Sequence, residues 1–474
     1  MALRAGHTMT TAIGSTFQSH RRFVTKAGRV VHLASMAALG SVIWACSPAN
    51  EDPRASGGRG GTASASGGGF SGTGATGGHA TAGNGGAGGA AEEGGAPAED
   101  SGGGARDGGQ AGLPCGFNEA ALCHPGVLNS RGSLDFVKAK IAAGQDPWKR
   151  AFDALAADPL ASMSRNPSPL AIVECGSYNM PNIGCVDELS DASAAYAQAL
   201  LFYFSGSAER AKKAIQYMNA WAAVIRSHTN SNAPLQSGWV ALNWTKAAEI
   251  IRYSDAGWAA ADVVAFREVL LNVYYPLTKG GSSANGNWEL TMIDANIGIG
   301  VFADDRAIFE GALAMWRGRV PAYIYLTSDG AAPKAPPGRN TPNWYSPGKY
   351  VDGLSQETCR DLSHTSYGLA NMIYTAETAR IQGVDLYGEE ATRIRAGYEF
   401  NIGLQQGADG GGICGGSINR DMMAFGEIAY NHFAVRQGMA MPNTLAYLKA
   451  ERPTAPTWHA VVWETITHAE IGSP

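Results

Sequence analysis

The chain has little charge and few signs of β-structure. Charged residues make up 16% of its 474 residues, and the formal net charge is −5. This balance offers no basic surface, so nothing in the composition indicates nucleic-acid binding. Runs in which apolar and polar residues alternate are nearly absent, so we expect no sheet of consequence. Hydrophobic residues account for 45% of the chain, which supports a sizeable core.

The N-terminal apolar run is too short and too rich in small residues for a transmembrane helix. It covers residues 30–45, follows a cluster of basic residues and ends just before Cys46. This pattern predicts an export signal over residues 1–46. A cysteine directly after such a run resembles a bacterial lipobox, in which Cys46 would be lipidated. The alternative is a plain signal peptide, and the protein would then be periplasmic or secreted instead of anchored to the outer membrane.

Glycine is concentrated in one part of the chain. Of the 62 glycines, 24 lie between Arg54 and Leu113. Residues 47–113 are rich in Gly, Ala and Ser and have almost no aliphatic or aromatic side chains. They cannot bury enough apolar surface to offset the entropy of an ordered chain, so we expect a disordered tether. The folded domain is predicted over residues 114–474.

No C-x-x-C pair is present, which argues against a structural zinc site. Six cysteines remain after Cys46, and an even number in an exported protein indicates disulfides. Proximity in the sequence suggests Cys115–Cys123 and Cys175–Cys185, and elimination leaves Cys359–Cys414. This set is one of several possible pairings.

The folded part has the pattern of consecutive helices. Apolar residues recur at intervals of three and four in nearly every segment. No repeat of fixed period is visible, so helical pairs in a closed or partly closed ring are favoured over a solenoid. We therefore predict an all-α domain, an (α/α) toroid or incomplete α/α barrel. The expected helices are 134–143, 147–157, 191–205, 208–226, 238–256, 258–275, 287–303, 305–325, 354–382, 386–406, 421–437 and 441–451.

Polar side chains are densest in residues 356–364. If the predicted helix 354–382 begins at a cap on Asp352 or Ser355, then Glu357, Asp361 and His364 share one of its faces. Gly383 would end this helix. Such a face is either a solvated surface or the wall of a site. Two carboxylates and an imidazole could also hold a divalent ion, but one helix seldom supplies all ligands. We predict no metal and no cofactor.

Two polar loops lie outside the expected helices. The connection 327–351 is long, rich in Pro and Gly, and carries Trp344 and Tyr345 just before the polar stretch. Loops of this length are usually functional or disordered, so we expect it to cover a ligand. The second loop carries Tyr178 and Asn179 between Cys175 and Cys185.

Three segments resemble a known family. They are 285–294 (NGNWELTMID), 352–364 (DGLSQETCRDLSH) and 427–432 (EIAYNH), and residues 147–152 and 191–204 resemble its N-terminal helices. Together they resemble the alginate-lyase domain superfamily, most closely polysaccharide lyase family 38 and more distantly family 5. The resemblance implies a lyase that needs no cofactor and binds a uronate-containing polysaccharide. The polymer would be a β-1,4-linked uronate, either mannuronate-rich alginate or glucuronan.

The resemblance also implies roles for four residues. Asn287 would neutralise the substrate carboxylate, and Arg360 would orient or neutralise it. His364 would act as a base or as a second neutralising group. Tyr430 would act as the acid, and for one epimer also as the base. The sequence leaves open which of these two takes the proton. Tyr367 stands where family members commonly carry a non-aromatic residue.

Further polar and aromatic residues are predicted to bind the sugar chain. Each has a structural alternative, such as a helix cap, an ion pair or a packed ring. Two other functions also remain: a hydrolase on the same scaffold, with carboxylates among Glu289, Asp294, Glu357 and Asp361, and a surface protein that only captures polysaccharide. The predicted binding residues are Tyr178, Asn179, Trp239, Trp288, Trp344, Tyr345, Gln356, Glu357 and His432.

Overall fold

The computed structural model describes residues 121–339, 343–454 and 463–471. The export signal 1–46 with Cys46, the tether 47–113 and Cys115 lie outside these residues. Lipidation, the tether, the domain boundary and the Cys115–Cys123 pair therefore stay predictions.

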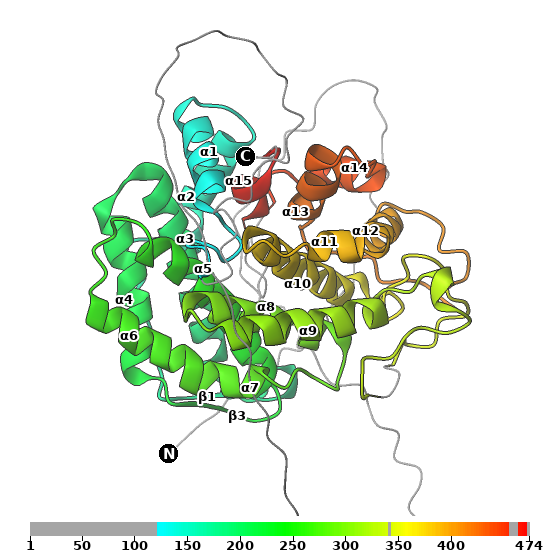
Figure 1. Ribbon diagram of the computed structural model, residues 1–474, viewed down its shortest axis with the longest axis horizontal. Helices are drawn as coiled ribbons and strands as arrows, with labels where there is room; N and C mark the ends of the chain where they lie inside the picture. The colour runs from blue at the N-terminus through cyan, green and yellow to red at the C-terminus, as the bar shows by residue number, and fades with distance from the viewer. Residues whose placement is uncertain (1–120, 340–342, 455–462, 472–474) are drawn as a thin grey trace, which may run out of the picture. The chain divides into compact units, whose positions relative to one another are not determined.

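Helices dominate the described part of the chain, as the sequence predicts (Figure 1). Most begin and end within a few residues of the expected positions. Three predicted helices are interrupted. Wider turns follow α6 over Leu270–Tyr274 and α13 over Asn431–Arg436, and the predicted helix 386–406 is divided at Glu390 into α11 and α12. The helices are α1 (Arg131–Ala142), α2 (Trp148–Ala157), α3 (Cys185–Ser205), α4 (Ala208–Val224), α5 (Ala233–Arg252), α6 (Ala260–Val269), α7 (Tyr275–Thr278), α8 (Gly286–Phe302), α9 (Arg306–Tyr323), α10 (Leu362–Ile381), α11 (Leu386–Glu389), α12 (Ala391–Gln405), α13 (Glu427–Tyr430), α14 (Pro442–Glu451) and α15 (Glu464–His468).

Helices α3, α5, α8 and α10 pack side by side in this order, and α3, α5 and α8 run in one direction. Near their starts, Gln236 of α5 donates a hydrogen bond to Glu188 of α3 over 2.9 Å. Near their ends, Arg252 of α5 donates to the carbonyl oxygen of Phe302 in α8 over 2.6 Å. Figure 1 shows α8, α9 and α10 beside one another. The starts of these inner helices therefore gather at one end of the domain.

The inner helices lack the polar face of an ordinary surface helix. Every residue of α8 is buried, because α5, α9 and α10 surround it. A helix that is covered on all sides belongs to the centre of a domain. In the part of the chain that the structure describes, no helix combines the length and the apolar composition needed to cross a membrane.

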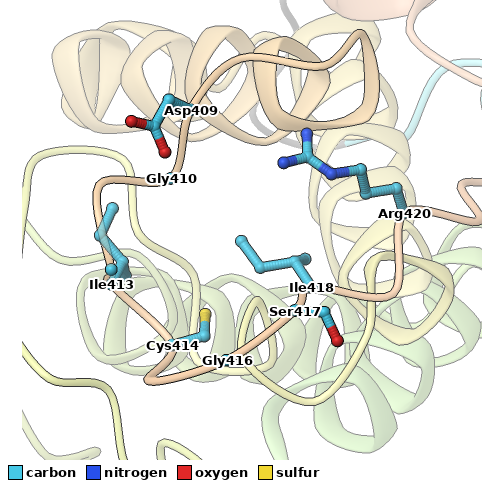
Figure 2. A pocket seen from close by; sticks show the side chains of 9 residues that line it. Asp409, Gly410, Ile413, Cys414, Gly416, Ser417, Ile418 and Arg420 are labelled. Atoms are coloured by element: carbon cyan, nitrogen blue, oxygen red, sulfur yellow. The ribbon is translucent and has the colours of Figure 1, made fainter.

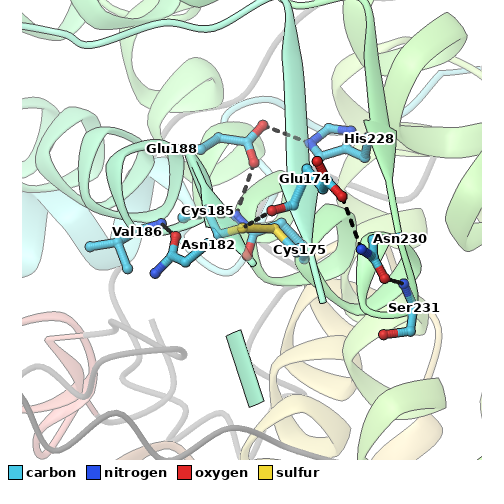
Figure 3. The surroundings of a disulfide bond; sticks show 10 residues. Glu174, Cys175, Asn182, Cys185, Val186, Glu188, His228, Asn230 and Ser231 are labelled. Atoms are coloured by element: carbon cyan, nitrogen blue, oxygen red, sulfur yellow. Dashed lines mark hydrogen bonds and ion pairs between the residues drawn. A yellow bond between two sulfur atoms is a disulfide. The ribbon is translucent and has the colours of Figure 1, made fainter. Parts of the chain in front are cut away.

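One small sheet lies before the starts of α3 and α5. Its strands β1 (Ile172–Cys175), β2 (Asn182–Ile183) and β3 (Ser227–Thr229) lie in the order β2-β1-β3. β1 is antiparallel to β2 and parallel to β3. The predicted Cys175–Cys185 disulfide joins β1 to the first residue of α3 (Figure 3). The loop that carries Tyr178 is therefore closed by its own disulfide, as predicted.

A buried ion pair joins α5 to α8. Lys246 Nζ lies 3.2 Å from Asp294 Oδ2, and both side chains are almost completely buried. The ammonium also lies 4.8 Å from the centroid of the Tyr374 ring in α10. A buried charge without its partner is costly, so the two residues depend on each other.

We expect Lys246→Met and Asp294→Asn each to lower the free energy of unfolding by about 3–5 kcal/mol, because each leaves an uncompensated buried charge. The free energy of unfolding of the double variant should fall by much less than the sum of the losses in the two single variants. Denaturant unfolding of the four proteins measures this coupling. The exposed pair Arg317–Glu389 (2.7 Å) is the control, and its coupling should stay below about 1 kcal/mol. Equal coupling in the two pairs would contradict the expectation.

Candidate functional site

The polar stretch before α10 is a chain of turns and not a helix. Residues 356–360 form successive turns, and α10 begins only at Leu362. Asp361 is the N-cap, and its Oδ1 accepts a hydrogen bond from the His364 backbone N–H over 2.7 Å. The predicted helix start, the caps at Asp352 or Ser355 and the shared helical face are therefore wrong. Asp favours caps because its carboxylate satisfies the first backbone N–H groups. Gly383 follows the helix with φ 85°, as predicted.

Glu357 is the centre of the candidate site. Its Oε1 accepts hydrogen bonds from Asn287 Nδ2 over 2.8 Å and from Arg360 Nη1 over 3.1 Å. Its Oε2 accepts a longer bond of 3.4 Å from the Tyr323 hydroxyl. Glu357 is 0% exposed, and burial raises the pKa of its carboxyl although the charges of His364 and Arg360 oppose this. Glu357 thereby positions Asn287 and Arg360, and its predicted contact with substrate stays a prediction.

His364 and Asp361 form a second pair. His364 Nδ1 lies 2.7 Å from Asp361 Oδ2. Burial alone would raise the pKa of Asp361, but the hydrogen bond and charge of His364, together with the charge of Arg360, hold it below its usual value. An ionised Asp361 accepts the Nδ1 proton, which leaves Nε2 as the ring atom for proton transfer. Asp361 thereby fixes both the helix start and the tautomer of His364.

Arg360 lies between these two carboxylates and a tyrosine. Its Nη1 lies 3.4 Å from the Tyr345 hydroxyl, and its guanidinium carbon lies 5.6 Å from the centroid of the Tyr345 ring. Tyr345 is half-buried, and burial with the nearby charge of Glu357 raises its pKa to about 12. Its hydroxyl therefore stays protonated near neutral pH. The loop 327–351 thus brings one predicted aromatic residue to the site.

The tyrosine ring in direct contact with His364 is Tyr367. The two ring centroids lie 6.3 Å apart in an edge-to-face arrangement, and Tyr367 is one turn further along α10. Tyr430 is half-buried at the end of α13, which packs against α10. Tyr367 was not among the predicted site residues. Its position three residues after His364, on the same helical face, is the signal that could have identified it.

The start of α8 approaches the site closely because its first residue is a glycine. A Cβ atom on Gly286 would lie 2.2 Å from the Tyr323 ring and 2.6 Å from Gln356 Oε1, so no other side chain fits. Gln356 is itself buried, and its Nε2 donates to the carbonyl oxygen of Asn343 over 3.1 Å. Gln356 thus holds the loop that carries Tyr345, and its predicted contact with substrate stays a prediction.

Several predicted sugar-binding residues belong to the core. Trp239 and Trp288 lie buried in α5 and α8, and His432 is stacked on the Tyr387 ring at a centroid distance of 3.6 Å. Trp344 is 4% exposed and packs with Tyr325, Leu354 and Ile413. Packing covers these four rings in the structure, and their predicted contacts with sugar stay predictions. The Trp344 indole is large and mostly apolar, so its packing against these residues holds the loop against the domain.

The loop between Cys175 and Cys185 shows the opposite behaviour. Tyr178 is 62% exposed and has φ 56°, a left-handed conformation that turns the chain sharply. Asn179 follows it, and its side chain lies outside the described part of the structure. Both residues precede α3, at the end of the domain where α8 begins and where Asn287 lies in its first turn.

The Cys359–Cys414 disulfide is present, as predicted. It joins the residue before Arg360 to the glycine-rich loop 406–420, whose backbone surrounds a pocket of about 180 Å³. In Figure 2, Asp409 and Arg420 lie on two sides of this pocket, and Ile418 points between them. The disulfide thus gives the turns that carry Glu357 and Arg360 a fixed support.

The residues that the structure describes contain no group of three His, Cys, Asp or Glu side chains arranged to hold a metal ion. The metal interpretation of Glu357, Asp361 and His364 therefore has no geometric support. Instead, the carboxylates of Glu357 and Asp361 hold Asn287, Arg360 and His364.

Comparison with known proteins gives consistent matches. The family model of alginate lyase matches residues 180–406. The crystal structure of alginate lyase A1-III from Sphingomonas species A1 has a TM-score of 0.53 with 16% identity, over 74% of this chain and 97% of that chain. A variant of alginate lyase A1-III in complex with a tetrasaccharide has a TM-score of 0.51 with 16% identity, over 68% and 92% of the two chains. A comparison with curated proteins found no match. These likenesses show the fold, and the predicted (α/α) toroid is confirmed.

We expect Asp361→Asn to lower the free energy of unfolding by about 1–3 kcal/mol at pH 7, because asparagine keeps the cap but loses the charged bond to His364. The pKa of Asp361 is lowered in the folded state, so this stabilisation is present above the ordinary carboxyl pKa of about 3.9 and is lost as the pH falls further. Denaturant unfolding between pH 7 and pH 3 measures the difference.

Asp305→Asn is the matched control, since Asp305 caps α9 by accepting from the Ile308 N–H over 3.1 Å. Asp305→Asn should lower the free energy of unfolding only slightly, and this loss should not show the pH dependence expected for Asp361→Asn. A difference between wild type and Asp361→Asn that stays constant down to pH 3 would contradict the role of the ion pair.

Proposed function

We propose that this chain, a polysaccharide lyase that carries an alginate lyase domain over residues 180–406, cleaves a β-1,4-linked uronate polymer by β-elimination. The polymer is mannuronate-rich alginate or glucuronan, and the product has a 4,5-unsaturated uronate at its new end. One observation carries the proposal. Asn287 and His364 occupy the first turns of the neighbouring helices α8 and α10, and Arg360 is tied to Asn287 through Glu357.

The chemistry requires such a cluster because the proton at C5 is barely acidic while the neighbouring carboxylate is charged. Its removal creates an enolate-like dianion that the site must stabilise. The Asn287 amide and the Arg360 guanidinium supply donors for the two carboxylate oxygens. The helix dipoles add partial positive charge at the starts of α8 and α10. Glu357 holds the donors in place, so they need not reorganise during the reaction.

His364 is the proposed base. Asp361 binds Nδ1, so Nε2 can take the C5 proton and the resulting imidazolium is stabilised by the same carboxylate. The C5–H electrons then form the C4=C5 double bond while the C4–O bond breaks. A tyrosine hydroxyl gives its proton to the leaving oxygen and recovers one from solvent. No metal or cofactor enters this scheme.

Two tyrosines are candidates for the acid. The family resemblance favours Tyr430, on a helix that packs against α10. The contact between rings favours Tyr367, which touches His364 directly. We retain Tyr430 as the proposed acid and Tyr367 as its alternative. Tyr345, beside Arg360, and the exposed Tyr178 are the aromatic residues proposed to contact the sugar chain.

The hydrolase alternative receives less support. A hydrolase needs two carboxyl groups that flank the bond, one of them free to donate a proton. Glu289 binds Arg319 and Arg339, and Asp294 binds Lys246 in the core. Glu357 and Asp361 are likewise occupied by the site's own donors. Each of these carboxylates has an architectural role.

Export fits this proposal. The polymer lies outside the cell, and two disulfides are typical of an oxidising compartment. We therefore propose a periplasmic, outer-membrane-anchored or secreted enzyme, with any membrane contact made through Cys46 alone.

Ultraviolet absorbance tests the function, since elimination creates a double bond conjugated to the carboxylate, and hydrolysis creates none. The purified full chain is mixed with polymannuronate, polyguluronate, glucuronan and hyaluronan in separate assays. We expect rising absorbance on polymannuronate or glucuronan. New reducing ends without absorbance would establish a hydrolase, and neither signal with retained binding would establish a capture protein. His364→Ala should abolish cleavage and retain polymer binding.

Substitution of the two tyrosines identifies the acid. We expect Tyr430→Phe to lower kcat by about 100-fold or more, because the loss of a general acid removes this contribution to the rate. Tyr367→Phe, which keeps the ring contact with His364, should change kcat by less than about 10-fold. Steady-state kinetics with unchanged thermal unfolding measures both effects. The reverse order would transfer the acid role to Tyr367.

A further inference from the structure

A second polar pocket lies at the other end of the inner helices. It has a volume of about 550 Å³, within the range of about 300–1,000 Å³ typical of ligand sites. Its lining comes from α1, from the last turn of α3 and from the end of α5 with the turn that follows. The lining residues are Arg131, Asp135, Lys138, Phe202, Tyr203, Gly206, Arg252, Tyr253, Ser254 and Asp255.

This pocket is separate from the candidate site. Helix α5 has 20 residues and therefore spans about 30 Å. Its first turns lie beside the start of α3, where Gln236 meets Glu188. Its last residue, Arg252, lines the pocket. The Asn287 end and the pocket are thus at opposite ends of parallel helices.

Three cations face the pocket from two elements. Arg131 and Lys138 lie two turns apart on one face of α1, and Arg252 ends α5. Arg131 donates to the carbonyl oxygen of Tyr253, and Arg252 donates to that of Phe302 over 2.6 Å. These bonds fix the two guanidinium groups against the C-terminal carbonyls of α5 and α8, where cations are favoured. A guanidinium has five N–H donors, so donors remain for a ligand.

The pocket also contains acceptors. Asp135 accepts a hydrogen bond of 2.7 Å from the Tyr203 hydroxyl, and Asp255 lies exposed on the turn after α5. The lining carries three cations and two carboxylates, and Arg252 Nη2 also lies 3.5 Å from Asp304 Oδ2, outside the lining. Among the described residues Arg131 and Lys138 belong to no ion pair, so the lining suits a ligand with a single negative charge and several hydroxyl groups. The two carboxylates would repel a phosphate dianion. A phosphate dianion also lacks the several hydroxyl groups of a sugar, which can donate to Asp135 and Asp255.

We propose that this pocket is a second binding site for the polymer and that it holds a uronate residue of a chain segment outside the catalytic site. The assignment of the ligand rests on the proposed function. The uronate carboxylate binds Arg131, Lys138 and Arg252, and its ring hydroxyls donate to Asp135 and Asp255. Binding at two places raises the effective concentration of the polymer at the catalytic site, and only a long chain can occupy both.

Lys138→Glu tests the proposal, because Lys138 is exposed and its ammonium lies 5.5 Å from the centroid of the Tyr203 ring, a weak contact. Lys212→Glu is the matched control, since Lys212 is an exposed lysine on α4 and makes the same change in net charge. In the full chain, Lys138→Glu should raise KM for long polymannuronate several-fold with unchanged kcat. It should leave KM for a polymannuronate tetrasaccharide unchanged, and Lys212→Glu should change neither.

An equal KM of the two variants for the long polymer would overturn the proposal. So would an equal rise of KM on the tetrasaccharide, because that would indicate general repulsion of the substrate. Retention on immobilised polymannuronate tests binding independently of cleavage. If wild type cleaves no polymer, weaker retention of Lys138→Glu than of Lys212→Glu still supports the pocket, and equal retention refutes it. If Lys138→Glu lost retention on immobilised polyphosphate as much as on polymannuronate, the pocket would bind anions in general, and the assignment of a sugar ligand would be refuted.

Discussion

A buried carboxylate, that of Glu357, organises the candidate site. Burying a charged carboxylate costs several kcal/mol unless donors surround it. Asn287, Arg360 and Tyr323 supply those donors from α8, from the turns before α10 and from the end of α9. The three segments are far apart in the sequence, and their common partner is what brings them to one point. The same hydrogen bonds therefore stabilise the buried carboxylate and fix the positions of the donors.

The parallel inner helices decide where chemistry can occur. Their starts meet at one end, so that end collects backbone N–H groups and partial positive charge. An anionic substrate is favoured there even before side chains are considered. Asn287 lies two residues after the N-cap of α8, and His364 lies three residues after the N-cap of α10. The backbone of each helix start therefore already places these side chains at the candidate site. The ends of these helices have the opposite polarity, and basic side chains such as Arg131 and Arg252 lie there.

The sequence predicts the helices well because each apolar periodicity is long. It also predicts two disulfides and the principal polar residues. It fails where a single side chain overrides a pattern. Asp361 ends the turns and starts α10, so a helix expected from residue 354 begins at Leu362. Trp344 looks like a loop residue, but apolar neighbours 10 to 69 residues away bury it. The contact between the rings of Tyr367 and His364 is known only from the structure. The complete burial of Glu357 is likewise visible only in the structure.

The shared carboxylate also limits how such a protein can change over evolutionary time. A substitution at residue 357 removes an acceptor that Asn287 and Arg360 share, and Asn287 is the buried member of that pair. Changes at these three positions are therefore coupled, and in related sequences we expect the positions to co-vary. Exposed positions such as Tyr178, by contrast, can change without disturbing the core. Specificity can diversify within this architecture while the charge cluster stays constant.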